Sequence, residues 1–186
     1  RAARRAAALR AANSTVARDL ERVLGGNSIE VMLEVGSPQV VPIARPPDAD
    51  RSGPLRVFWA GQFHAFKALP QLLDALARLP ADVEWELTIA GDGPERSRWC
   101  RRARKLGIED RITWLGWVEH GAMSNLFFES DVFVFTSLRD TTGSVVLEAL
   151  AAGVPVVAPD HQGVGDVVND DCGVLVPVTD YGSMVD

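Results

Sequence analysis

Apolar runs and amphipathic stretches alternate along the chain from Leu55 onward. Six short runs rich in Val, Ile, Leu and aromatic residues have the length and composition of buried strands. These strands are predicted at Leu55–Ala60, Glu86–Ala90, Ile112–Leu115, Val132–Thr136, Val154–Ala158 and Gly173–Val176. The stretches between and after them predict helices at Lys67–Leu79, Pro94–Leu106, Ala122–Glu129, Ser144–Ala152 and Val164–Asn169. Such alternation predicts an α/β fold, a Rossmann-like parallel sheet with flanking helices.

The character of the sequence changes before Leu55. Residues 36–54 hold five of the eleven prolines, together with Ser, Asp and Gly, which is typical of a linker between domains. Upstream of them, Ser14–Leu24 has a helical pattern and Ile29–Leu33 has a strand-like one. We therefore expect a short helix–strand unit, then a linker, then the domain that contains the sheet.

Composition narrows the classes of function. The net charge is -6 and the pI is about 5.1, which argues against nucleic acid as a partner because phosphate backbones require a basic surface. No apolar run reaches the roughly 18 residues that a membrane helix needs, so no transmembrane segment is predicted. Cys100 and Cys172 are too few for a disulfide framework or a zinc site, and we interpret them as buried apolar residues in a reducing cytoplasm.

The most informative segment runs from the apolar residues 131–135 into the helix predicted at Ser144–Ala152. In a parallel sheet, ligands bind where the C-terminal ends of strands meet the N-termini of helices. The loop at that point presents unpaired N–H groups with the positive end of a helix dipole behind them, which makes an anion site, most often for phosphate. Its candidate residues are Thr142, Gly143, Ser144 and Val145.

Two carboxylates flank this loop, Asp140 before it and Glu148 inside the helix, with seven residues between them. A helix turns about 100° per residue, so the acid in its second turn can point back over the loop. We expect one acid to contact a sugar ring and the other a ribose.

The spacing of these residues resembles that of a known family. The pattern acid, seven residues, Glu-Ala-x-Ala-x-Gly-x-Pro-Val, from Asp140 to Val156, is similar to the nucleotide-sugar signature of the retaining glycosyltransferases of family 4, which have the GT-B fold. The chain departs from this signature at Asp140, where Glu is commoner, so the shorter side chain must lie closer to the sugar.

The resemblance implies an organisation for the chain. Residues 1–35 are expected to be the tail end of an N-terminal acceptor domain, and residues 36–54 the interdomain linker. Residues 55–186 are expected to be the donor domain, truncated at its C-terminus. The chain would then be a fragment of a longer protein that binds the donor weakly by itself and does not turn over.

A second candidate segment follows the first predicted strand, from Gly61 to Lys67. In the family this position usually holds an Arg and a Lys that neutralise the donor diphosphate. Lys67 matches the lysine, and a lysine pairs with phosphate as a point charge. Gln62 stands in place of the arginine, with His64 as an alternative source of the second cation. The resemblance thus implies donor contacts by Gly61, Gln62 and Lys67.

The loop after the third predicted strand is the candidate base pocket. The family receives the nucleotide base there through backbone groups and an apolar wall, and the matching residues are Trp117 and Val118. The turn Gly91-Asp92-Gly93-Pro94 could line the same pocket. We interpret the cationic stretch Arg96–Lys105 as a solvated helix face, with a lipid-surface or acidic-partner patch as the alternative.

The function implied by the resemblance is transfer of a sugar from a nucleoside diphosphate sugar to a hydroxyl acceptor, a sugar or a lipid-linked glycan, with retention of configuration. Lys67 and the N–H groups at Gly143–Val145 would stabilise the leaving diphosphate. Glu148 would hold the ribose and Asp140 the donor sugar. No metal or other cofactor is implied, because fixed cations and dipoles would take its role. The expected location is the cytoplasm, including the inner face of the membrane.

Two alternatives remain open from the sequence. A nucleotide-sugar epimerase of the same fold would need catalytic acids in both domains. A non-catalytic sugar-nucleotide-binding module is favoured by Gln62 and Asp140, which replace the usual residues of the family.

Overall fold

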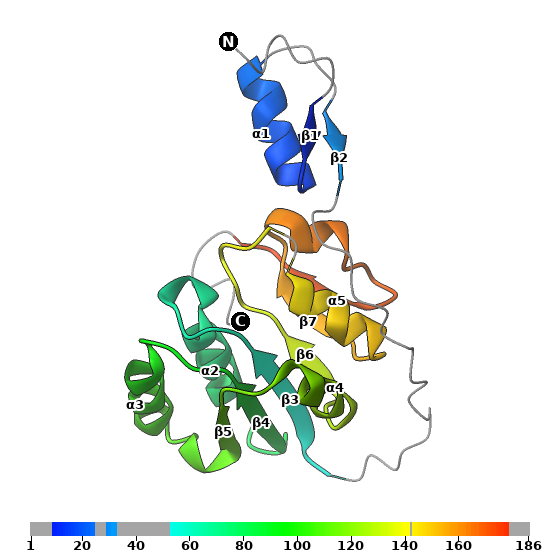
Figure 1. Cartoon of the computed structure of the whole chain (residues 1–186). Helices are drawn as coiled ribbons and strands as arrows, with labels where there is room; N and C mark the ends of the chain where they lie inside the picture. Colours follow the sequence, from blue (N-terminus) through cyan, green and yellow to red (C-terminus); the bar gives the residue numbers. More distant parts are fainter. Residues whose placement is uncertain (1–8, 25–28, 33–52, 142, 179–186) are drawn as a thin grey trace.

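The computed structural model describes residues 9–24, 29–32, 53–141 and 143–178, which form two parts (Figure 1). The larger part is a six-stranded parallel sheet with helices on both faces, and the smaller part is one helix with two short strands. The predicted α/β class, a Rossmann-like parallel sheet with flanking helices, is confirmed.

The sheet contains all six predicted strands. They are β3 (Leu55–Ala60), β4 (Trp85–Ala90), β5 (Ile112–Gly116), β6 (Val132–Val134), β7 (Val156–Pro159) and β8 (Gly173–Val176). Their order across the sheet is β5-β4-β3-β6-β7-β8, and every neighbouring pair is parallel. After β3, the chain therefore adds β4 and β5 on one side. It then returns to the other side of β3 and adds β6, β7 and β8. Ligands of such sheets bind outside the C-terminal ends of the strands at this point of reversal.

Four of the five predicted helices of the larger part are present. They are α2 (Leu69–Arg78), α3 (Arg96–Leu106), α4 (His120–Phe128) and α5 (Ser144–Ala151), joined by the short 3-10 helices η2 (Ala65–Lys67), η3 (Glu109–Arg111) and η4 (Gln162–Asp166). Lys67 ends η2 rather than opening α2, because Ala68 adopts a left-handed conformation at φ 53° that separates the two helices.

The prediction of a helix at Val164–Asn169 was wrong, since the 3-10 helix η4 ends at Asp166 and residues 167–169 are not helical. Gln162 enters this turn in a left-handed conformation at φ 56°. The backbone of Gly163 packs so closely on the loop of Thr141 that a Cβ atom would lie 1.8 Å from the Thr141 carbonyl oxygen. This close approach fixes the chain in a tight turn and leaves no regular helix.

Strand β3 supplies residues to two hydrophobic cores. Val57 and Trp59 pack with α2 and α3 on one face, whereas Phe58 and Ala60 pack with α4 and α5 on the other. All four side chains are buried. Because both faces of the sheet are covered, the strand is a continuous apolar run rather than an alternating one.

An ion pair joins β3 to the start of β6. Asp131 accepts hydrogen bonds from the Nε and Nη2 atoms of Arg56, at 3.0 and 2.9 Å, and from the Arg56 backbone N–H at 2.9 Å. The Asp131 side chain is nearly buried, and this hydrogen-bonded carboxylate raises the pKa of the Arg56 guanidinium. The pair therefore fixes how the two central strands meet at their N-terminal ends.

The smaller part consists of β1 (Arg10–Ala11), α1 (Ser14–Leu24) and β2 (Glu30–Val31) around a small core of Ala11, Ala17 and Ile29. The helix predicted at Ser14–Leu24 is confirmed. Part of the strand predicted at residues 29–33 is present, and Leu33 lies outside the described residues. Apart from residues 53 and 54, the predicted linker also lies outside them. Helix α1 packs against η4 of the larger part.

Candidate functional site

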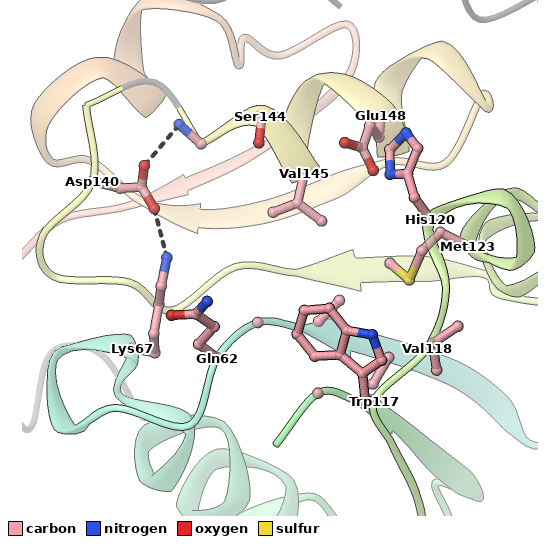
Figure 2. A pocket seen from close by; sticks show the side chains of 15 residues that line it. Gln62, Lys67, Trp117, Val118, His120, Met123, Asp140, Ser144, Val145 and Glu148 are labelled. Atoms are coloured by element: carbon pink, nitrogen blue, oxygen red, sulfur yellow. Dashed lines mark hydrogen bonds and ion pairs between the residues drawn. The ribbon is translucent and has the colours of Figure 1, made fainter. Parts of the chain in front are cut away.

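A pocket of about 380 Å³ opens at the C-terminal ends of the central strands. Ten of the eleven predicted site residues line it, and most of their side chains are labelled in Figure 2: Gly61, Gln62, Lys67, Trp117, Val118, Asp140, Gly143, Ser144, Val145 and Glu148. Thr142, the other one, lies outside the described residues. Segments that are far apart in the sequence thus meet at one edge of the sheet, as expected for a parallel α/β fold.

Lys67 is held in place by the segment that follows strand β6. The Thr136 hydroxyl donates to the Lys67 carbonyl at 2.6 Å and accepts the indole N–H of Trp59 at 2.9 Å. The backbone N–H of Leu138 also donates to the Phe66 carbonyl at 2.8 Å. These bonds tie η2 to the segment after β6, so the Lys67 backbone is fixed while its side chain extends into the pocket.

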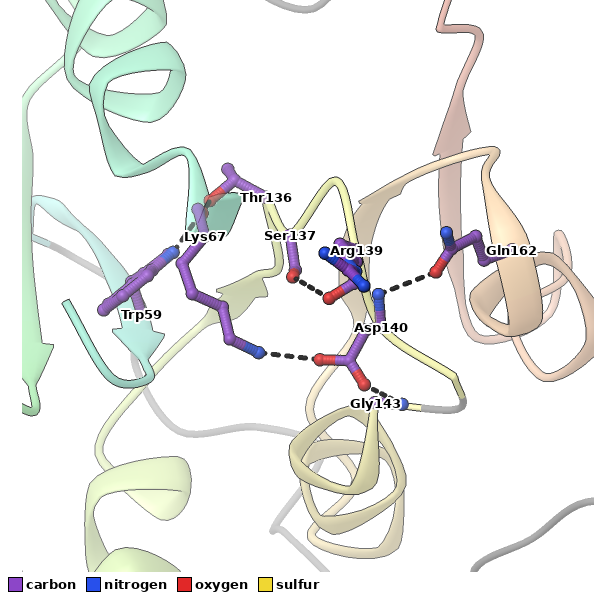
Figure 3. Close-up of polar contacts among 8 residues, drawn as sticks. All are labelled: Trp59, Lys67, Thr136, Ser137, Arg139, Asp140, Gly143 and Gln162. Carbon is purple, nitrogen blue, oxygen red and sulfur yellow. Dashed lines mark hydrogen bonds and ion pairs between the residues drawn. The ribbon is translucent and has the colours of Figure 1, made fainter. Parts of the chain in front are cut away.

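The Lys67 ammonium forms an ion pair with Asp140, with 2.7 Å between Nζ and Oδ2 (Figure 3). Both side chains are about one-fifth exposed. The other Asp140 oxygen accepts the Gly143 N–H at 3.1 Å. Asp140 therefore binds the Lys67 ammonium and the Gly143 N–H, two groups that were assigned from the sequence to the diphosphate.

Glu148 lies in the second turn of α5, partly buried in the pocket wall. Burial raises the pKa of its carboxyl, and the positive charge of His120 opposes this shift. His120 comes from the first turn of α4 and lies beside Glu148 (Figure 2). Sequence reasoning missed His120, although its position just after the candidate loop of Trp117 and Val118 was a usable signal.

The part of the pocket where the sequence predicts the nucleotide base combines an exposed aromatic ring with closely packed backbone. Trp117 is 74% exposed, although it follows a strand of the sheet. A Cβ atom at Gly91, whose φ is 131°, would lie 1.9 Å from the Gly61 carbonyl oxygen. Glycine is therefore required where these two loops form the floor, and Gly91 lines the pocket as the sequence suggested.

His64 does not supply the cation that Gln62 lacks. Its ring stacks on Phe66 with 5.5 Å between centroids, and it is not among the residues that line the pocket. Among the residues that the structure describes, Lys67 is therefore the only lysine or arginine that lines the pocket.

Most cations of α3 are paired with acids, which supports their interpretation as a solvated helix face. The ion pairs are Arg96–Asp92, Arg98–Glu95, Arg102–Asp74 and Arg104–Glu109. Within the described ranges, no helix is long and apolar enough to cross a membrane. Among the same residues, no group of three or more His, Cys, Asp or Glu side chains is placed to hold a metal ion.

The fold and the position of the pocket define a doubly wound α/β domain with a pocket at the point where the strand order reverses, which is where such folds bind their ligands. The family model "Glycosyl transferases group 1" matches residues 43–186. The chain therefore belongs to the group 1 glycosyl transferases.

The names of curated relatives describe enzymes of glycoconjugate synthesis. The chain is 31% identical over 125 residues to N-acetyl-alpha-D-glucosaminyl L-malate synthase of Bacillus anthracis, covering 67% of this chain and 32% of that protein. It is 34% identical over 122 residues to the lipopolysaccharide core biosynthesis glycosyltransferase LpsE of Rhizobium meliloti, covering 64% of this chain and 34% of that protein. The chain thus spans about a third of the length of these relatives.

Solved structures show the same fold. The lipopolysaccharide outer core galactosyltransferase WaaB matches with a TM-score of 0.83 and 24% identity, over 97% of this chain and 51% of that protein. The Anabaena protein HepE, solved in complex with UDP, matches with a TM-score of 0.71 and 22% identity, over 97% of this chain and 52% of that protein. The chain therefore corresponds to about half of each of these GT-B structures.

Proposed function

We propose that this chain is the donor-binding half of a retaining glycosyltransferase, which transfers a sugar from a nucleoside diphosphate sugar to a hydroxyl acceptor. The observation that carries the proposal is that Lys67, Asp140 and Glu148 meet in one pocket at the point of strand reversal. Such a donor needs a cation for its phosphates and acceptor groups for its hydroxyls, and the pocket contains both. Binding of UDP by the similar HepE structure supports the same ligand class.

Within this proposal, each side chain has a separate role. Lys67 stabilises the charge that grows on the leaving diphosphate, together with N–H groups at the start of α5. Glu148 accepts hydrogen bonds from the ribose, and Asp140 accepts them from the donor sugar. No metal is required in this scheme, because the lysine and the helix N-terminus supply the positive charge. Retention of configuration is proposed from the resemblance of the Asp140-to-Glu148 spacing to the family 4 signature.

The remainder of the protein is proposed to supply the acceptor site. The unit of α1, β1 and β2 would be the end of the acceptor domain, and residues 36–54 the linker to the donor domain. The acceptor would be a hydroxyl of a sugar or a lipid-linked glycan, in polysaccharide or glycoconjugate biosynthesis. The relatives named for lipopolysaccharide synthesis support this class. We propose a cytoplasmic location, at the inner membrane face if the acceptor is lipid-linked.

A non-catalytic sugar-nucleotide-binding module is the second candidate. It is favoured by Gln62, a neutral residue in the pocket, and by the ion pair that already neutralises Lys67. A diphosphate would then enter a site in which the acids outnumber the lysine.

Titration calorimetry with UDP and UDP-glucose tests whether this chain binds the proposed donor class. We expect UDP to bind and Lys67→Ala to weaken it. Release of UDP from a panel of nucleotide sugars by the full-length protein then tests catalysis. Binding without release or sugar conversion selects the binding module, and conversion of the sugar without transfer selects the epimerase. Failure of the chain to bind any nucleoside diphosphate would exclude the donor site.

A further inference from the structure

The loop that carries Asp140 is held from outside by residues that do not line the pocket. The Asp140 N–H donates to Oε1 of Gln162 at 2.7 Å (Figure 3). The carbonyl of Thr141, the residue after Asp140, accepts a hydrogen bond from Nδ2 of Asn13 at 3.1 Å. The Gly163 backbone packs against the same carbonyl, where no Cβ atom would fit. The N–H of Asp140 and the carbonyl of Thr141 are thus each fixed by a partner from another segment.

Asn13 uses both ends of its side-chain amide. Its Oδ1 atom accepts the Val16 N–H at 2.9 Å and so caps α1, while its Nδ2 atom reaches Thr141, 128 positions along the chain. Asn13 is 1% exposed, so an amide without these partners would be costly. A second bond, from the Ser14 N–H to Oδ2 of Asp166 at 2.7 Å, attaches the same helix start to η4. The first turn of α1 is therefore anchored directly to the loop of Asp140.

Gln162 is held in a conformation that its residue type disfavours. Its φ of 56° lies in the left-handed region, where a residue with a Cβ atom is strained by roughly 1–2 kcal/mol relative to the right-handed region. Glycine adopts this conformation without that strain. Glycine would, however, lack the amide oxygen that accepts the Asp140 N–H. An outlier of this kind points to a role for the side chain that it presents.

We propose that Asn13 and Gln162 are positioning residues that set where the Asp140 carboxylate lies in the pocket. This inference rests on the proposed function, in which Asp140 contacts the donor sugar. Asn13 belongs to the N-terminal unit, so the placement of Asp140 depends on how that unit packs against the sheet. Recognition of the sugar is thereby coupled to the arrangement of the two parts, whereas the backbone of Lys67 is held by the sheet domain.

Two substitutions separate this role from a structural one. Asn13→Asp keeps an oxygen that caps α1 but replaces the Nδ2 donor with an oxygen facing the Thr141 carbonyl. Gln162→Gly removes the acceptor for Asp140 but relieves the left-handed backbone, so the folded protein should be no less stable. Arg22→Ala serves as the control, because Arg22 is an exposed residue of α1 whose ion pair is with Asp19 of the same helix.

Amide hydrogen exchange on this chain is the first measurement. We expect exchange in residues 139–146 to accelerate about tenfold in Asn13→Asp and Gln162→Gly, with strand β3 and the melting temperature of Gln162→Gly unchanged. A tenfold change is the size expected for one buried hydrogen bond, about 1.4 kcal/mol. Unchanged exchange in both variants overturns the inference, and this result does not depend on any ligand.

Calorimetry with UDP and UDP-glucose is the second measurement. Both variants should bind UDP at least as tightly as the native chain, because a displaced Asp140 releases Lys67. The affinity gained from the sugar should fall about tenfold, as for a lost hydrogen bond. Equal weakening for UDP and UDP-glucose would overturn the positioning role. If the native chain binds no UDP, the proposed function fails, and the exchange experiment still decides whether Asn13 and Gln162 hold the loop.

Discussion

The Lys67 ammonium and the Asp140 carboxylate, separated by 73 positions in the sequence, lie 2.7 Å apart in the pocket. The two residues were assigned from the sequence to different parts of one ligand, the phosphates and the sugar. In the structure they neutralise each other. A nucleoside diphosphate must therefore compete with Asp140 for Lys67, and this competition can be measured.

Asp140→Asn should tighten UDP binding by about 1 kcal/mol, because it releases Lys67 from a partly exposed ion pair. The same change should reduce discrimination between UDP and UDP-glucose, since the carboxylate for the sugar is lost. Calorimetry of the single variant, of Lys67→Ala and of the double variant measures the coupling. Weaker UDP binding by Asp140→Asn would show that Asp140 supports the phosphates rather than competing with them.

Gln62→Arg should tighten UDP binding by up to about 1–2 kcal/mol by adding the second cation of the family pattern, and Lys67→Ala should weaken it. The gain should shrink as salt is added, because partly exposed charges are screened. Gln71→Arg adds the same charge on α2, outside the residues that line the pocket, and controls for net charge. An equal gain from both arginines would indicate a long-range effect of charge instead of a phosphate contact.

Glu148→Gln should weaken UDP binding by about 1–3 kcal/mol, the loss expected for hydrogen bonds to a charged group. Glu119→Gln makes the same chemical change just before α4, at an exposed position that does not line the pocket. It should leave UDP binding unchanged. If the two variants behave alike, Glu148 is a structural residue.

UDP affinity should also depend on pH through Glu148. Burial raises the pKa of this carboxyl, so on acidification it becomes protonated at a higher pH than an ordinary glutamate. The hydrogen-bond acceptor for the ribose is then lost as the pH falls, and affinity decreases through that range. His120→Gln removes the opposing positive charge and should move the midpoint to higher pH. Calorimetry across pH checks this, and Glu148→Gln should abolish that transition.

Asp131→Ala should lower the free energy of unfolding by about 2–3 kcal/mol. It removes a nearly buried acceptor and leaves the Arg56 N–H without this partner. Arg104→Ala breaks the exposed pair with Glu109 and should change stability by less than about 1 kcal/mol. Urea unfolding of both variants tests the contrast, and equal losses would contradict it.

The strands could be predicted because each is a short apolar run, and central strands such as β3 are covered on both faces. The segments of the pocket were also predictable, because a parallel sheet places all its strand ends at one edge. The contacts between those segments were not. Lys67 with Asp140, and Glu148 with His120, depend on loop conformations and on how α4 packs beside α5, which no local pattern contains. The helix expected at Val164–Asn169 failed for the same reason, because the loop of Thr141 contacts Gly163 from elsewhere in the chain.

Strands β3 and β6 pair over two residue pairs, Val57 with Val132 and Phe58 with Phe133, whereas β3 and β4 pair over six. Lys67 follows β3 and Asp140 follows β6, so their ion pair connects the two halves of the sheet where the strands pair over only two residue pairs. A sugar nucleotide that contacts both residues would bridge the two half-sheets again. A nucleotide without its sugar would separate Lys67 from Asp140 and bridge nothing. The contacts that hold the two halves of the sheet together would then differ between the complex with the sugar nucleotide and the complex with the nucleoside diphosphate that remains after transfer.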